Sequence, residues 1–96
     1  MEIVGFKHKG LERFWESGNS KGLPASLAPK IRNILDSIDA AKDIEEWLTL
    51  AWGRPHALKG DRKGDYAISV NRNMRITFTY DGERIAALNL DYEDYH

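Results

Sequence analysis

The sequence contains no cysteine among its 96 residues. This absence excludes a disulfide framework, a zinc site built on thiolates and a cysteine nucleophile. A small chain without cysteine also fits a reducing compartment. Long apolar runs are missing as well, so no segment approaches the ~20 apolar residues of a membrane-spanning helix. The opening residues, MEIVGFKHKG, lack the apolar segment of a signal peptide. We therefore expect a cytoplasmic protein that makes no contact with membranes.

A strong net charge is also lacking, because 14 basic and 15 acidic side chains leave a net charge of −1. The charges are nevertheless segregated along the chain. Residues 1–35 carry +3, residues 36–50 carry −4, residues 51–80 carry +4 and residues 81–96 carry −4, which sum to −1. Two interpretations stay open: a surface that neutralises itself, or a phosphate-binding patch in the middle of the chain.

What the sequence does contain is enough apolar material, 42% of its residues, for a folded core. Its length favours one domain over residues 1–96. Leu11, Phe14 and Trp15 have the spacing of an amphipathic helix. A second helix is expected after Pro24, with its apolar positions repeating over four turns: Leu27, Ile31, Ile34, Leu35 and Ile38. A short third helix is expected within residues 43–50, with its tryptophan facing inward.

From residue 65 the apolar period changes to two, which is typical of strands. The segments DYAISV, MRITFTY and AALNLDY each place alternate apolar residues on one face. In the last segment these residues are Ala86, Leu88, Leu90 and Tyr92. The segments NRN and DGE between them favour hairpin turns, and EIVGF at residues 2–6 is expected to be a first strand. The predicted fold class is α+β, with N-terminal helices packed on one face of a curved antiparallel sheet.

The sheet face away from the helices carries the candidate functional residues. Polar side chains come from this face, from the preceding RPHALKGDRKG segment and from the C-terminal DYEDYH: Arg75, Thr77, Thr79, Asn89, Asp91, His56, Lys59, Arg62, Lys63, Asp94, Tyr95 and His96. Taken singly, each has an ordinary structural explanation, such as a solvated cation on a strand or a charged turn. Taken together, they contain the parts of one reaction.

That reaction is cleavage of RNA through its own 2′-hydroxyl. It needs a base for the hydroxyl, an acid for the leaving 5′-oxygen and cations around the phosphorus. Two histidines, or one histidine with an aspartate or tyrosine, would supply acid and base. A metal site built from His56, His96 and Asp94 is not favoured, because HxxxH and HExxH spacings are absent. A glycine-rich phosphate loop and a GxSxG elbow are absent too. We therefore expect neither a metal nor a cofactor.

The stretch PHALKGDRKGDYAISVNRNMRITFTYDGE, followed by LDYEDYH, resembles the HigB-type toxins of the RelE/ParE superfamily, the killer proteins of plasmid-maintenance systems. The resemblance covers roughly residues 3–96. It implies a fold like that of microbial ribonucleases and an endoribonuclease that cuts mRNA in the ribosomal A site and arrests growth. It also implies a helix-turn-helix antitoxin of the HigA kind as partner, with DNA bound only through the toxin–antitoxin complex.

The resemblance also assigns roles to matching positions. Catalytic roles fall on His56, Lys59, Arg75, Asp94, Tyr95 and His96. Apart from the resemblance, the basic residues of the central block are expected to contact RNA, namely Arg54, Arg62, Lys63 and Arg72. Three positions depart from the family pattern. Met74 replaces the usual tryptophan, Arg72 replaces a turn glycine, and Trp52 and Gly53 are exchanged in order.

Two other functions share this fold or these residues. One is a gyrase poison of the ParE kind, which does not need the full acid–base set. The other is a degenerate, non-catalytic module that only binds the antitoxin, which the departures at Met74 and Arg72 leave open.

The C-terminal DYEDYH segment is itself open to two interpretations. His96 beside its own carboxylate would favour the charged imidazolium that a proton donor needs, whereas a plain acidic tail would only aid solubility. Codon preference, the assignment of acid and base, and the antitoxin's docking surface do not follow from the sequence.

Overall fold

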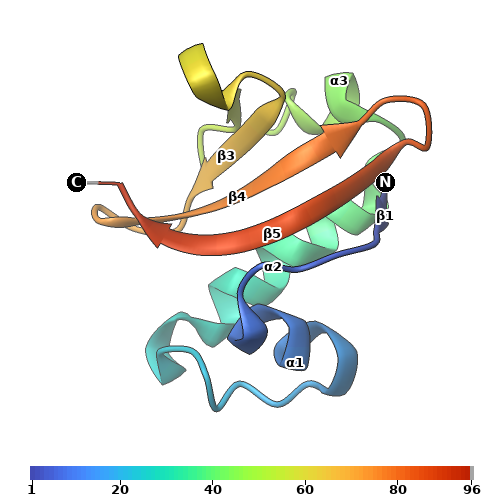
Figure 1. Ribbon diagram of the computed structural model, residues 1–96. Coiled ribbons are helices and arrows are strands. Elements are labelled where there is room, and N and C mark those ends of the chain that lie inside the picture. The colour runs from blue at the N-terminus through green and yellow to red at the C-terminus, as the bar shows by residue number, and fades with distance from the viewer. Residues whose placement is uncertain (96) are drawn as a thin grey trace.

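Five strands form one sheet in the computed structural model, which describes residues 1–95 (Figure 1). The order across the sheet is β1–β5–β4–β3–β2. The strands are β1 (Glu2–Ile3), β2 (His56–Ala57), β3 (Asp65–Ser69), β4 (Met74–Asp81) and β5 (Ala86–Asp94). Strands β2 to β5 pair antiparallel, as the hairpin turns predict, but β1 is parallel to β5. The expected all-antiparallel sheet is therefore wrong at β1. The helices and the other three strands lie between β1 and β5 in the chain, so no hairpin turn fixes their relative direction.

The three α-helices lie in the first half of the chain, as the apolar spacing predicts. They are α1 (Lys9–Ser17), α2 (Ala28–Ala40) and α3 (Ile44–Trp47), with 3₁₀ turns η1 (Ala25–Leu27) and η2 (Gly60–Arg62). Helix α1 ends at Gly18 in the left-handed conformation, where glycine is favoured. Pro29 lies in the first turn of α2, so it interrupts no helical hydrogen bond. Within residues 1–95, every helix is too short or too polar to cross a membrane.

The core lies between the helices and one face of the sheet (Figure 1). The inward positions of α2 are fully buried, namely Ile31, Ile34, Leu35 and Ile38. Trp47 of α3 is also buried, and its ring meets that of Phe78 edge-on at 4.9 Å between centroids. The α+β class, with helices covering one sheet face, is therefore confirmed.

A bulge in β5 changes which side chains face the core. Thr77 pairs with Asp91 and Thr79 with Leu88, so two residues of β5, Asn89 and Leu90, oppose the single Phe78 of β4. Asn89 adopts a φ of 56°, which asparagine tolerates better than most residues. Leu90 belongs to the core as predicted, but Leu88 shares the face of Thr79 instead. The prediction for Leu88 is wrong because the extra residue breaks the strict period of two.

Candidate active site

The open face of the sheet carries Arg75, as the alternation along β4 predicts. Its neighbours Met74 and Ile76 pack in or against the core, so the side chain of Arg75 lies on the other side. In the register of the sheet Arg75 is flanked by Ser69 of β3 and Glu93 of β5. Three strands therefore bring polar side chains together on one face.

Glu93 is the centre of this polar network. Its Oε1 accepts hydrogen bonds from Arg75 Nε at 2.9 Å and Arg75 Nη2 at 2.8 Å. Arg62 Nη1 donates to the same oxygen at 2.7 Å, and Thr77 Oγ1 donates to Oε2 at 3.2 Å. Burial raises the pKa of Glu93, but the hydrogen bonds and charges of Arg62 and Arg75 outweigh it and hold the pKa below its ordinary value. The carboxylate therefore stays ionised at neutral pH.

Arg62 completes the network from the loop after β2. Besides its bonds to Glu93, its Nε lies 3.4 Å from Asp65 Oδ2, and Asp65 Oδ1 accepts a hydrogen bond from Thr79 at 2.7 Å. The hydrogen bond from Arg62 to Glu93 is the main cause that raises the pKa of Arg62. Both edges of this guanidinium are engaged within the protein. The RNA contact of Arg62 stays a prediction, and the partners that the structure gives this side chain are the carboxylates of Asp65 and Glu93.

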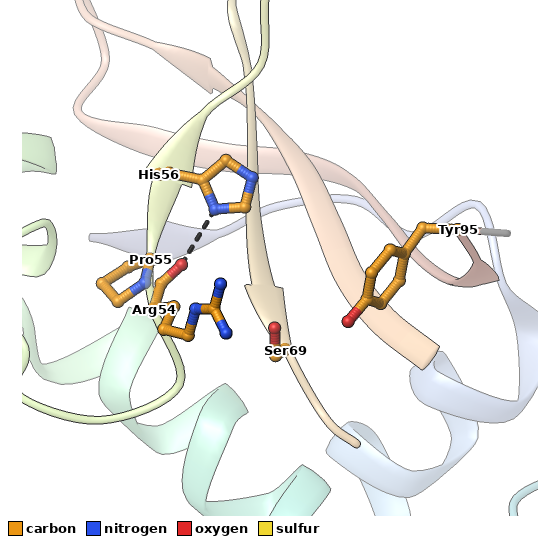
Figure 2. A pocket seen from close by; sticks show the side chains of 5 residues that line it. All are labelled: Arg54, Pro55, His56, Ser69 and Tyr95. Carbon is orange, nitrogen blue, oxygen red and sulfur yellow. Dashed lines mark hydrogen bonds between the residues drawn. The ribbon is translucent and has the colours of Figure 1, made fainter. Parts of the chain in front are cut away.

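His56 stands beside a hollow of about 470 Å³ at the edge of the sheet (Figure 2). Its lining residues are Arg54, Pro55, His56, Ser69 and Tyr95. His56 Nδ1 lies 2.8 Å from the carbonyl oxygen of Arg54. A carbonyl oxygen only accepts, so Nδ1 carries a proton and donates. In Figure 2 the other ring nitrogen, Nε2, is turned away from that carbonyl, on the side where Tyr95 lies. It is available to exchange a proton with a bound molecule.

The turn before His56 depends on Gly53. Gly53 has a φ of 77° and Arg54 a φ of 56°, both in the left-handed region. A Cβ on Gly53 would lie 2.6 Å from Ile68 Cγ1, so this position has no room for a side chain. The carbonyl of Gly53 accepts a hydrogen bond from the Ser69 amide at 2.8 Å, which joins the turn to β3. The order Trp52–Gly53 therefore places a glycine where the backbone needs one, and Trp52 itself is exposed.

The C-terminal residues reach the same face from β5. Tyr95 is 40% exposed, its amide donates to Asn73, and the guanidinium of Arg75 lies 5.4 Å from its ring centroid. Tyr95 therefore connects the hollow beside His56 to Arg75. Asp94 pairs with Met74, so it lies on the opposite face of β5 from Glu93 and is exposed. His96 lies outside the described residues.

The remaining predicted cations lie apart from the hollow beside His56. Lys59 and Lys63 line a separate hollow of about 650 Å³, together with Leu58 and Tyr66. Arg72 belongs to the exposed turn between β3 and β4. The structure thus groups His56, Arg54 and Tyr95, links Arg75 to them through the Tyr95 ring, and places Lys59 on a neighbouring surface. Among residues 1–95, no three His, Asp or Glu side chains gather as a metal-ligand set.

The sequence interpretation did not name Glu93, the residue with the most side-chain partners on this face. A signal for it exists: Asp91 and Glu93 are two residues apart after the bulge, so they share the face of Thr77 and Arg75. Asp91 lines a smaller polar hollow of about 240 Å³ on this face, beside Thr79 and Asn89. The acidic tail is thus part of the polar network, and Glu93 pairs with two cations of the central block, Arg62 and Arg75.

Comparisons with known proteins agree with one another. The family model described as "RelE-like toxin of type II toxin-antitoxin system HigB" matches residues 4–96. A curated relative, endoribonuclease HigB of Proteus vulgaris, is 44% identical over 95 residues, covering 98% of this chain and 99% of the relative. A heterotetrameric YoeB–YefM toxin–antitoxin complex from Staphylococcus aureus contains a chain with 24% identity and a TM-score of 0.61, covering 100% of this chain and 97% of that one. The YoeB/ParE toxin from Agrobacterium tumefaciens shares 15% identity with a TM-score of 0.60, over 97% and 99% of the two chains. The two structural likenesses concern the fold alone.

Proposed function

This chain belongs to the RelE-like HigB toxins of type II toxin–antitoxin systems, and from that premise we propose that it cuts mRNA in the ribosomal A site through the RNA's own 2′-hydroxyl. It is a toxin of the endoribonuclease kind, because it is 44% identical to the Proteus vulgaris endoribonuclease HigB over nearly its whole length. The matching family model and the curated relative are both HigB, so neither supports the alternative of a ParE-like gyrase poison.

The observation that carries the mechanism is the orientation of His56. Its Nδ1–H is held by the Arg54 carbonyl, which fixes the tautomer with a lone pair on Nε2 when the ring is neutral. We assign Nε2 as the base that takes the proton of the 2′-hydroxyl. The 2′-oxygen then bonds to phosphorus, and the bond from phosphorus to the 5′-oxygen breaks. The leaving oxygen takes a proton from a donor in the C-terminal DYH segment, for which we propose His96.

Cations stabilise the charge that develops on the phosphate. Arg75 lies beside the hollow and presents donors over Tyr95, while Arg54 lines the hollow itself. We assign Arg75 to the phosphate, and Lys59 and Lys63 to the adjoining RNA backbone. The exposed ring of Tyr95 is suited to stacking on a nucleotide base. The nucleophile belongs to the RNA, so the proposed reaction needs no metal.

A toxin that cuts translated mRNA must be held inactive in its own cell. We propose a helix-turn-helix antitoxin of the HigA kind, with DNA bound only through that complex. Action on ribosomes also places the proposed activity in the cytoplasm. Basic residues on and near α1 and α2 are candidates for contacts with ribosomal RNA, namely Lys7, Lys9, Arg13, Lys30 and Arg32.

The test is induced expression of the chain alone, with growth and mRNA ends followed over time. Growth arrest with new cleavage sites inside translated codons is expected. His56→Gln should abolish both, whereas His8→Gln should keep both, because His8 caps α1 through its Nδ1 and contacts Tyr92 away from the open face. Arrest without RNA cleavage would point to a gyrase poison. A folded protein that neither arrests growth nor cuts RNA would be the degenerate module.

A further inference from the structure

We propose that Glu93 is a positioning residue for the cleavage reaction: it holds Arg75 by one edge, so that the opposite edge of the guanidinium faces the reacting phosphate. This inference rests on the proposed function, since it concerns the same site. Glu93 itself is not expected to touch the RNA. Its role is to fix the direction and rotation of a cation that otherwise ends a long, freely rotating side chain.

Among residues 1–95, the contacts of Arg75 leave one edge of its guanidinium available. A guanidinium offers two pairs of donors that suit an anion: Nε with Nη2 along its side, and Nη1 with Nη2 at its end. Glu93 Oε1 takes the side pair, at 2.9 and 2.8 Å. The ring of Tyr95 covers a face, with its centroid 5.4 Å from the guanidinium carbon. The end pair is left for a phosphate, in the bidentate geometry that arginine uses best.

Glu93 is itself prevented from turning away. Arg62 donates a hydrogen bond to each carboxylate oxygen of Glu93, from Nη1 at 2.7 Å and from Nη2 at 3.4 Å. Thr77 Oγ1 donates to Oε2 at 3.2 Å. The side chain of Glu93 is only 21% exposed, and that of Arg75 only 20%. A hydrogen-bonded chain therefore runs from Asp65 through Arg62 and Glu93 to Arg75. Exposed ion pairs contribute little, but this one is part of a network on a half-buried face.

A purely structural ion pair predicts something different. If Glu93 only stabilised the fold, its replacement would lower the melting temperature and leave the maximal cleavage rate of the folded protein unchanged. If Glu93 positions Arg75, the rate of the chemical step must fall while RNA affinity does not. Removing the carboxylate also leaves one more uncompensated positive charge on this face, which favours RNA binding and steepens its salt dependence.

The experiment measures single-turnover cleavage of a defined mRNA on programmed ribosomes, with saturating protein. Glu93→Gln removes the charge and keeps the size of the side chain, and Glu83→Gln removes the same charge from the exposed β4–β5 turn as a matched control. We expect Glu93→Gln to lower the maximal rate by about 10–100-fold, the range for a displaced catalytic group, and to bind the mRNA-programmed ribosome at least as tightly as the wild type. Glu83→Gln should cleave at the wild-type rate.

A double-mutant cycle with Arg75→Ala gives the decisive readout. If Glu93 acts through Arg75, adding Glu93→Gln to Arg75→Ala should change the rate by less than about threefold, because both changes remove the same interaction. Losses that multiply, or a wild-type rate in folded Glu93→Gln, would overturn the inference. If Glu93→Gln does not fold, Glu93→Asp is measured instead, because its shorter carboxylate cannot hold both arginines. We expect Glu93→Asp to lower the rate by about tenfold in the wild-type background and to have no effect in the Arg75→Ala background. A wild-type rate in Glu93→Asp overturns the inference. A wild-type protein that leaves the mRNA intact would instead refute the proposed function.

Discussion

Replacing Gly53 by alanine is expected to be among the most damaging single-methyl changes in this chain. Gly53 has a φ of 77°, and a Cβ there would lie 2.6 and 2.8 Å from the Cγ1 and Cδ1 atoms of Ile68. The left-handed conformation costs an alanine about 1–2 kcal/mol. Ile68 is fully buried in the core, so it cannot move aside freely, and such overpacking adds about 1–3 kcal/mol. The sum, about 2–5 kcal/mol, is a large part of the stability of a small domain.

Gly18 provides a matched control for this change. It has the same φ of 77°, but nothing lies within 4 Å of the point that a Cβ on Gly18 would occupy. Gly18→Ala should therefore lose only the conformational part, about 1–2 kcal/mol. Urea unfolding of both purified variants, followed by circular dichroism, gives the two free energies of unfolding. The Gly53 variant should also melt at least about 4 °C below the Gly18 variant. Equal losses would refute the reasoning, because the contact with Ile68 would then carry no cost.

Three further predictions concern the site and its charges. Lys59→Ala should weaken binding to the mRNA-programmed ribosome and reduce the salt dependence of that binding, because one contact to the RNA backbone is lost, without lowering the melting temperature; unchanged affinity and salt dependence would remove Lys59 from the RNA-binding set. Cleavage should survive a chelator at concentrations that leave the ribosome intact, and complete loss would indicate a required metal. The pKa of Glu93 is lower in the folded protein than its ordinary value, so its contribution to stability is present above that ordinary value and is lost as the pH falls through the lowered one. The free energy of unfolding should therefore fall below about pH 5 more steeply in the wild type than in Glu93→Gln, and parallel pH curves would contradict this assignment.

Much of this architecture could be predicted because the apolar pattern is regular. The positions on α2 and the alternation along β4 lead directly to the buried residues and to the exposed side of Arg75. The parallel pairing of β1 could not be predicted in the same way, because it depends on the path of the helices and not on a local turn. The bulge at Asn89 could not be predicted either, since an asparagine within a strand segment does not by itself indicate a positive φ.

The sequence indicates which face of the sheet carries the candidate residues, but not how their charges pair. The family resemblance gives Arg75 a catalytic role and the basic central block gives Arg62 an RNA contact, but the sequence does not show which carboxylate either guanidinium meets. The structure separates them, because Glu93 binds one edge of Arg75 but occupies Arg62 together with Asp65. Which cation keeps a free edge depends on side-chain geometry across three strands, and a single sequence does not contain that information.

Because of the extra residue in β5, the number of residues in this strand determines which side chains face the core and which face the open side. Residues on either side of Asn89 are placed on their faces by count, so a single deletion there would remove the bulge and reverse one flank of the strand. If the segment after Asn89 changed faces, Glu93 would point into the core. The hydrogen bonds of the network on the open face would then be lost although all of its residues are still present. Substitution by glycine, which accepts a positive φ, leaves the count intact. The strand therefore tolerates a change of identity at this point far better than a change of length.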